Sequence, residues 1–317
     1  MTRTLVTGAG GFVGQALVHA LAAKADGEIV ATDLAFASPP ASAGVRWHEE
    51  RLDDPAAIAR LFASPFDRIV HLATVAGVGS AQFDLGRATN LVAMQMLLEA
   101  ARRPEAPPRF VYASSVGVFG PPLPDAVDDA TLPVPTTSYG THKLIGELLV
   151  SDYSRAGLID GIALRLPGIV ARPAGSDTML SAFLSDMFHA ARRGEPLTIP
   201  LAGEDRTWVM SRTRLIDNLL HALDLPAERL PQRRYWTLPA LAVRIDALIA
   251  ALERVYGRER VAGLTCIPDA AVRRSFAQVP LVAAGATALG FRGDTDADAL
   301  VQAVIAASPD LSPQGAL

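Results

Sequence analysis

The segment TSYGTHKLIGELLVSDYSR, residues 137–155, contains two side chains of types that could transfer a proton. Tyr139 and Lys143 are four residues apart, so on a helix they lie on one face. An ammonium group beside a phenol lowers the phenol's pKa from its ordinary value of about 10, which makes the tyrosine a better general base. An exposed pair on an ordinary helix has the same spacing, so the pair alone does not decide between the two readings.

A glycine-rich turn, VTGAGGFVG, lies near the start of the chain. Gly8, Gly11 and Gly14 follow the apolar run TLVT and lead into the helical pattern FVGQALVHALAAK. Glycine allows a tight turn and a close approach of the backbone to a pyrophosphate. The first helical turn, with Phe12 and Val13, presents N–H groups to the phosphates. The strand before the turn and the helix after it predict a dinucleotide site.

Asp33 ends the next predicted strand, EIVATD, where a carboxylate can accept hydrogen bonds from the adenosine ribose hydroxyls. The same carboxylate repels the additional phosphate of NADP. The following residues, DLAFAS, supply no arginine or lysine to hold that phosphate. The sequence therefore predicts NAD as the cofactor.

Short apolar runs such as DRIVHLA and RFVYASS alternate with longer helical patterns over the first two-thirds of the chain. This alternation predicts an α/β fold, a Rossmann-type doubly wound parallel sheet with helices on both faces. We expect residues 1–171 to form the NAD-binding domain, with some later chain packing back onto it. More frequent proline breaks indicate that residues 172–308 form most of a smaller substrate-binding lobe. Residues 309–317 are expected to be a flexible tail.

The bulk composition excludes several classes of partner. The 317 residues carry a net charge of -4, which argues against a surface for nucleic acid or anionic membrane. Cys266 is the sole cysteine, so no intrachain disulfide can form, as is usual in a reducing compartment. No stretch has the length of a spanning helix or the pattern of a signal peptide. We expect a cytoplasmic protein that acts on a small molecule and needs no metal.

The glycine turn, the segment YASSVGVFG and the pair in YGTHK together resemble the extended short-chain dehydrogenase/reductase family, also called the NAD-dependent epimerase/dehydratase family. The resemblance extends from Thr4 to about Phe291. It implies that Tyr139 is the general base and that Lys143 lowers its pKa and binds the nicotinamide ribose. The family's serine falls on Ser115, which would orient the substrate oxygen; Ser114 competes for that role.

The family pattern also implies further cofactor contacts. It places Ala73, Asn90 and Leu52 near the cofactor, and Pro167 on its nicotinamide side. One departure concerns Arg51, which stands where many relatives have an acidic residue that contacts adenine. A side-chain contact would then be lost, leaving Leu52 to act through its backbone and packing, and the positive charge slightly weakens the case against NADP.

Within the family, residues 137–173 and the segment FDLGRATNLVAMQMLLEA resemble the D-erythronate dehydrogenase subgroup, which oxidises carbon 2 of a four-carbon sugar acid. Nucleotide-sugar epimerases usually have asparagine where this chain has Pro167, followed by Tyr-Gly-Pro, which is absent here. The chain departs from the subgroup at Ala174 and in the loop AGSDTML, where substrate choice could have changed.

A sugar acid needs a cation for its carboxylate, and arginine can hold it through two hydrogen bonds. Arg172 and Arg206 are the candidates, although each could be merely solvated or ion-paired. Thr74, just after HLA, could contact substrate hydroxyls or could simply pack at the end of a strand.

Alternative functions share the same motifs. They are a uronate or other sugar dehydrogenase, an NAD-dependent sugar epimerase, and a non-catalytic NAD-binding redox sensor. The sensor is disfavoured because such proteins often lack the tyrosine–lysine pair. The family resemblance also implies a homodimer formed by the helices expected over 82–103 and 138–156, although their apolar faces could simply cover the sheet.

Overall fold

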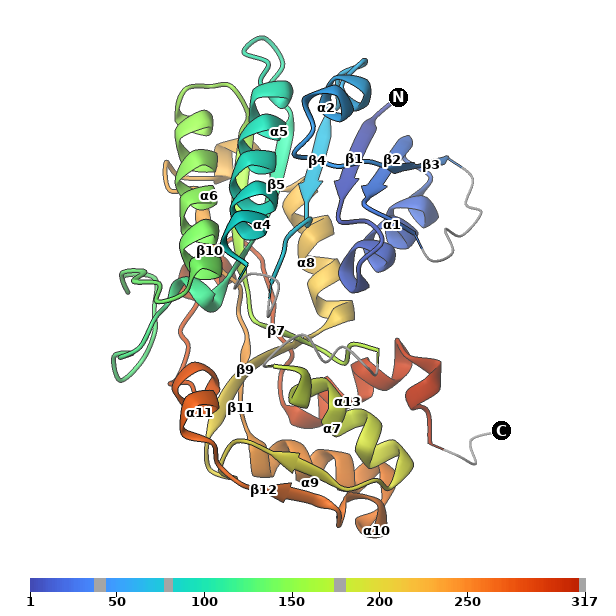
Figure 1. Cartoon of the computed structure of the whole chain (residues 1–317), viewed down its shortest axis with the longest axis vertical. Coiled ribbons are helices and arrows are strands. Elements are labelled where there is room, and N and C mark those ends of the chain that lie inside the picture. Colours follow the sequence, from blue (N-terminus) through green and yellow to red (C-terminus); the bar gives the residue numbers. More distant parts are fainter. Residues whose placement is uncertain (37–43, 77–81, 174–180, 314–317) are drawn as a thin grey trace. The chain divides into compact units, whose positions relative to one another are not determined.

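A computed structural model describes residues 1–36, 44–76, 82–173 and 181–313 of the chain (Figure 1). Ala174 and the rest of the loop AGSDTML, which the sequence singled out, lie outside the described residues. The chain divides into two compact units. The first comprises Met1–Phe119, Pro133–Leu166 and Ile216–Thr237, and the second comprises Gly120–Leu132, Pro167–Leu215 and Leu238–Leu317.

The first unit is built on a seven-stranded sheet in the order β10-β6-β5-β4-β1-β2-β3. All its neighbouring strands pair in parallel, which confirms the predicted doubly wound fold. The strands are β1 (Arg3–Thr7), β2 (Glu28–Asp33), β3 (Val45–Glu49), β4 (Arg68–His71), β5 (Arg109–Ser115), β6 (Asp160–Leu166) and β10 (Tyr235–Thr237).

Helices connect these strands: α1 (Phe12–Lys24), α2 (Pro55–Leu61), α4 (Phe83–Arg87), α5 (Ala93–Ala101), α6 (Ser138–Arg155) and α8 (Arg212–Asp224), with a π-turn at Ala88–Val92, 3-10 turns at Val116–Val118 and Ala227–Arg229. The chain runs outward from β1 to β2 and β3, and then to the other side of β1 for β4, β5 and β6. The carboxyl ends of β1 and β4 therefore flank the point where the strand order reverses, which is where open α/β sheets bind ligands.

The core of this unit forms where apolar strand residues meet the apolar faces of α5 and α6. Ile69 of β4 and Phe110 of β5 are fully buried in one cluster with Leu97 of α5 and Val150 of α6. In Figure 1, α4 and α5 follow one another end to end through the π-turn, and α6 stands beside them, in contact with both. Both faces of the strands β4 and β5 read as apolar because the sheet is covered on both sides.

Helix α6 packs very closely on β5 and on the turn that follows it. Its N-cap is Thr137, whose hydroxyl oxygen accepts the N–H of Gly140 at 3.1 Å. A Cβ at Gly140 would lie 2.1 Å from the carbonyl oxygen of Gly117, and one at Gly146 would lie 2.5 Å from the hydroxyl oxygen of Tyr112. Glycine at these positions therefore allows the close approach that places the first turn of α6 at the end of β5.

The second unit has two small sheets, in the orders β11-β9-β7 and β12-β8. A separate apolar core lies among α7, α9 and α13 and includes Phe188, Leu248 and Val301. Its elements are β7 (Gly168–Val170), α7 (Ala182–Arg193), β8 (Leu197–Ile199), β9 (Arg206–Ser211), β11 (Leu241–Arg244), α9 (Ile245–Tyr256), α10 (Arg258–Val261), β12 (Leu264–Cys266), α11 (Ala270–Phe276), α12 (Ala284–Ala288), α13 (Ala297–Ala306) and a 3-10 turn at Pro309–Leu311.

The division into units differs from the expected boundary near residue 171. The main part of the second unit begins at Pro167. The unit also includes the earlier segment Gly120–Leu132, in which Val127 pairs with Leu281. The expected flexible tail is anchored at its start, because Leu311 is buried and its carbonyl accepts the hydroxyl of Tyr256 at 2.6 Å. A sequence pattern could not show this pairing of segments far apart in the chain. No helix among the described residues is long and apolar enough to cross a membrane.

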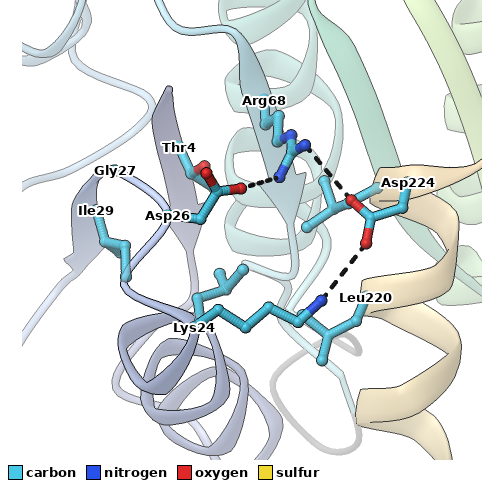
Figure 2. A pocket seen from close by; sticks show the side chains of 10 residues that line it. Thr4, Lys24, Asp26, Gly27, Ile29, Arg68, Leu220 and Asp224 are labelled. Carbon is cyan, nitrogen blue, oxygen red and sulfur yellow. Dashed lines mark hydrogen bonds and ion pairs between the residues drawn. The ribbon is translucent and has the colours of Figure 1, made fainter. Parts of the chain in front are cut away.

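The segment Ile216–Thr237 belongs to the first unit because β10 pairs with β6. Two groups of side-chain ion pairs also join this segment to the sheet. Asp160 at the start of β6 pairs with Arg109 at 2.7 Å and with Arg234 at 3.0 Å. At the amino ends of β1 and β4, Asp224 pairs with Lys24 and Arg68, each at 3.4 Å, beside a small cavity (Figure 2).

These two ion-pair groups predict different effects on stability. Asp160→Asn should lower the free energy of unfolding by about 2 to 3 kcal/mol, because two largely buried guanidinium groups lose their carboxylate. Asp224→Asn should cost less than about 1 kcal/mol, because that side chain is half exposed and its pairs are screened by water. Urea unfolding at pH 7 measures both, and equal losses would contradict this ranking.

Candidate active site

The glycine turn after β1 has the geometry of a phosphate cradle. Gly8 has a φ of +68°, and a Cβ there would lie 2.6 Å from the backbone nitrogen of Ala73. A Cβ at Gly14 would lie 2.1 Å from the carbonyl oxygen of Gly8. Helix α1 begins after Gly11 with no side-chain cap, so no side chain of the cap occupies the N–H groups of the turn that starts with Phe12 and Val13. Such a helix start fits a pyrophosphate.

Asp33 at the end of β2 is held directly against this turn. Its Oδ2 accepts the N–H of Gly10 at 2.8 Å, and its Oδ1 accepts the N–H of Leu34 at 2.7 Å. A carboxylate has about four acceptor positions, so it keeps capacity for two ribose hydroxyls. The structure therefore brings the acidic residue and the glycines together as the sequence predicted.

A buried threonine–histidine pair braces the turn, and sequence reasoning assigned it no role. The hydroxyl of Thr7 lies 2.7 Å from Nδ1 of His71 and accepts the N–H of Ala73 at 3.3 Å. Burial, together with the charge of Lys143, lowers the pKa of His71 to about 3, so the imidazole is neutral and its Nδ1 can accept the threonine hydroxyl. The pair joins the ends of β1 and β4, where Gly8 and Ala73 meet.

Asn90 fixes the chain that follows β4. It is buried in the π-turn Ala88–Val92. Its Oδ1 accepts the N–H of Val75 at 2.8 Å and the hydroxyl of Thr74 at 3.0 Å, while its Nδ2 donates to the carbonyl of Val75 at 2.9 Å. Asn90 and Thr74 are therefore neighbours, and Thr74 directs its hydroxyl proton to Asn90.

In the segment after β3, Arg51 has an acidic partner and Leu52 is buried. The guanidinium of Arg51 pairs with Asp53 at 2.7 Å, and the side chain of Leu52 is buried in the core of the first unit. Any contact of Leu52 with a ligand must therefore come from its backbone or from its packing.

The two serines at the end of β5 point into different surroundings, since successive strand residues face opposite sides of a sheet. Ser114 is buried and donates its hydroxyl to Oε1 of Glu147 at 2.5 Å. Ser115 is half-buried, and its Oγ accepts the N–H of Gly117 at 3.0 Å. Ser115 is thus the serine that a substrate could reach, which favours the register chosen from the sequence motif.

Tyr139 and Lys143 both lie at the carboxyl end of β5. Tyr139 is in the first turn of α6, and Gly117 separates its ring from Ser115: a Cβ on Gly117 would lie 3.6 Å from the ring and 3.3 Å from the serine oxygen. The ammonium nitrogen of Lys143 lies 5.6 Å from the centre of the Tyr139 ring. It donates to the carbonyl of Ala113 at 2.7 Å. The structure therefore gathers Ser115, Tyr139 and Lys143 into one group.

The environment of Lys143 is unusual for a lysine. The residue is 2% exposed, and burial lowers the pKa of its ammonium group to about 7, although Glu147 opposes part of this effect. A surface lysine on an ordinary helix would stay charged at any physiological pH. A buried lysine that titrates near neutrality, beside a tyrosine, is typical of a functional site.

The remaining predicted residues belong to the second unit. Pro167 is buried directly after β6. The backbone N–H of Arg172 donates to the hydroxyl of Ser185 at 3.0 Å, and its carbonyl lies 2.7 Å from Nε2 of His189. Arg206 is exposed at the start of β9. Their roles toward cofactor and substrate stay predictions.

The family model of the NAD dependent epimerase/dehydratase family matches residues 4–235. The chain belongs to this family. NAD is therefore its cofactor, and the turn with Gly8, Gly11 and Gly14, together with Asp33, has a geometry that fits this group. Within the described residues, no group of three or more His, Cys, Asp or Glu side chains could hold a metal ion.

Two curated relatives match this family member over nearly their full length. D-erythronate dehydrogenase of Cupriavidus necator is 37% identical, covering 94% of this chain and 96% of its own. D-erythronate dehydrogenase of Haemophilus influenzae is 33% identical, covering 96% and 98%.

Among solved structures, a nucleoside-diphosphate-sugar epimerase from Agrobacterium tumefaciens is 30% identical, with a TM-score of 0.91 and coverage of 98% and 95%. L-threonine 3-dehydrogenase of Trypanosoma brucei is 24% identical, with a TM-score of 0.86 and coverage of 99% of both chains; it shows the fold alone.

The position of Asp33 predicts a change in cofactor preference. Asp33→Ala should lower the ratio of kcat/KM with NAD to kcat/KM with NADP by about tenfold or more, because it removes both the ribose acceptor and the charge that repels the additional phosphate. Steady-state kinetics with each cofactor measure this ratio.

Asp26→Ala is the control, since it removes the same charge at the opposite end of the sheet, beside the amino ends of the strands. An unchanged ratio in Asp33→Ala, or an equal change in both variants, would refute the assignment of Asp33 to the ribose.

Proposed function

We propose that this protein oxidises the 2-hydroxyl group of D-erythronate to 2-dehydro-D-erythronate with NAD. The observation that carries the proposal is the group at the carboxyl end of β5, where a buried Lys143 lies beside Tyr139 and an accessible Ser115. The full-length similarity to two relatives named D-erythronate dehydrogenase supports the substrate.

The chemistry follows from the properties of these side chains. Bound NAD would supply the acceptor for the hydride. Tyr139 takes the proton from the substrate hydroxyl, since the phenol lies in the half-exposed first turn of α6. Lys143 stabilises the phenolate through its charge, and its position is set by the hydrogen bond to Ala113. Ser115 orients the hydroxyl and the developing carbonyl oxygen.

The carboxylate of a sugar acid would be held by Arg172 or Arg206, both described in the second unit. Neither side chain is buried, and an arginine can hold a carboxylate through two hydrogen bonds. Pro167 stands in place of the asparagine that nucleotide-sugar epimerases usually carry, which favours a sugar acid over a nucleotide sugar.

Tyr139→Phe should lower kcat by about a hundredfold or more, because the general base is lost while the ring and the packing of α6 are kept. NADH absorbance is followed with D-erythronate, L-threonate, uronic acids, free sugars and UDP-glucose. Tyr153→Phe, at the other end of the same helix, should retain activity.

Reduction of NAD with uronic acids instead of D-erythronate would keep the mechanism and discard the substrate. NAD that stays bound with no net reduction, together with conversion of a sugar to its epimer, would identify an epimerase. NAD binding without any turnover would identify a sensor.

We further propose that the chain forms a homodimer through α4 and α6. These helices contact each other and leave four large apolar side chains exposed: Phe83, Leu85, Ile145 and Leu148. Exposed large apolar side chains on two contacting helices are typical of an interface between subunits. A cytoplasmic location stays a prediction.

Light scattering at micromolar concentration should give the mass of two chains. Leu148→Asp should give the mass of one chain, because a carboxylate cannot be buried unpaired in the interface. Ile267→Asp changes an equally exposed side chain of the second unit and should leave the mass at two chains. A single-chain mass for the unmodified protein would refute the dimer.

A further inference from the structure

A fully buried carboxylate lies one helical turn beyond Lys143. Glu147 is 0% exposed, and its two oxygens accept three hydrogen bonds. Oε1 accepts the hydroxyl of Ser114 at 2.5 Å and Nε of Arg165 at 2.9 Å, and Oε2 accepts a terminal nitrogen of Arg165 at 2.7 Å. A buried carboxyl group is costly unless it is paired in this way, and these three hydrogen bonds hold Glu147 in one position.

The partner of this carboxylate is equally immobile. Arg165 on β6 is 1% exposed, and its guanidinium carbon lies 5.0 Å from the centre of the Phe119 ring and 4.8 Å from that of Tyr235. Planar guanidinium groups stack favourably on aromatic faces, and the bidentate pair fixes the orientation of the carboxylate. The whole assembly is therefore rigid and excludes water.

Three consecutive residues of β5 connect this assembly to the proposed active site. The carbonyl of Ala113 holds the ammonium group of Lys143, the hydroxyl of Ser114 donates to Glu147, and Ser115 lies beside Tyr139 across Gly117. Helix α6 is thus bonded to the end of β5 at two adjacent points. Tyr139, Lys143 and Glu147 follow one another at intervals of four on the same helix face.

Several elements that pack around Lys143 contribute titratable or charged side chains. Helix α6 contributes Tyr139, Glu147 and the adjacent His142. Strand β5 contributes Tyr112, and strand β4 contributes His71. Arg165 on β6 is hydrogen-bonded to Glu147. Burial raises the pKa of Tyr112 and lowers the pKa of His71 and His142, so these groups are neutral near pH 7. Glu147 opposes the loss of the proton from Lys143 that burial favours.

We propose that Glu147 is a positioning residue that favours the ammonium form of Lys143 in its buried site and thereby lets Tyr139 exist as a phenolate. The inference rests on the proposed roles of Tyr139 and Lys143. With one proton shared by the pair, the catalytic arrangement is an ammonium group beside a phenolate. Without the carboxylate, the proton resides on the tyrosine and the amine is neutral, so the base is lost until a higher pH.

The test measures the ionisation of Tyr139 directly and by kinetics in Glu147→Gln. Tyrosinate absorbance is titrated with and without Tyr139→Phe, and the difference isolates this phenol without any substrate. The pH dependence of kcat/KM is then measured with D-erythronate. Glu147→Gln should move the Tyr139 titration and the acidic limb of the profile upward together, by about one pH unit or more.

Asp160→Asn is the matched control. It removes a largely buried, arginine-paired carboxylate at the other end of β6, so it should lower Tm and leave the titration and the pH profile in place. If Glu147→Gln also lowers Tm but moves neither curve, the role of Glu147 is structural and the inference is wrong.

A second variant covers the case in which Glu147→Gln does not fold because Arg165 is left without its anion. Glu147→Gln/Arg165→Met removes both charges and fills the space between the two rings, and the same upward movement is expected. An enzyme that oxidises no sugar acid would overturn the proposed function alone, since the absorbance titration still decides the inference about Glu147.

Discussion

The arrangement of this protein's candidate active site depends on the close packing of α6 against the carboxyl end of β5. Glycines at 140 and 146 remove the side chains that would hold the helix away from the strand. The approach buries Lys143 and Glu147, which then must find partners on β5 and β6. The polar contacts around the candidate site thus follow from the two glycines on one face of α6, because they let the helix approach the strand.

A second close approach builds the cofactor end of the same sheet. Gly8 and Gly14 bring the turn after β1 within contact of the chain after β4, and the buried pair of Thr7 and His71 joins the two strands beneath it. Neutral histidine suits this position because a charged imidazole would be buried without a counterion. The glycine turn and the group of Ser115, Tyr139 and Lys143 therefore lie at the carboxyl ends of three neighbouring strands of one sheet, β1, β4 and β5.

Local patterns predicted much of this site. Each motif is local in the sequence: the spacing of the glycines, the acid at the end of the second strand, and the tyrosine with a lysine four residues later. The structure placed Gly8, Gly14 and Asp33 together as expected. It also gave Thr74 a partner, Asn90, and withdrew Ser114 from the substrate's reach, which only the strand's orientation could decide. The boundary between the two units differed because Gly120–Leu132 pairs with a segment far along the chain.

By itself, the sequence determined the fold class, the cofactor and the family, because these depend on periodicity and on short motifs whose backbone conformation is local. Tertiary structure alone decided what surrounds the motif residues. Glu147 and Arg165 look like a helix surface acid and a strand-end base in the sequence, yet they form a fully buried pair, since burial and ion pairing depend on which distant segments meet. The lowered pKa of Lys143 likewise follows from its burial against β5, and Glu147 of its own helix opposes part of that effect.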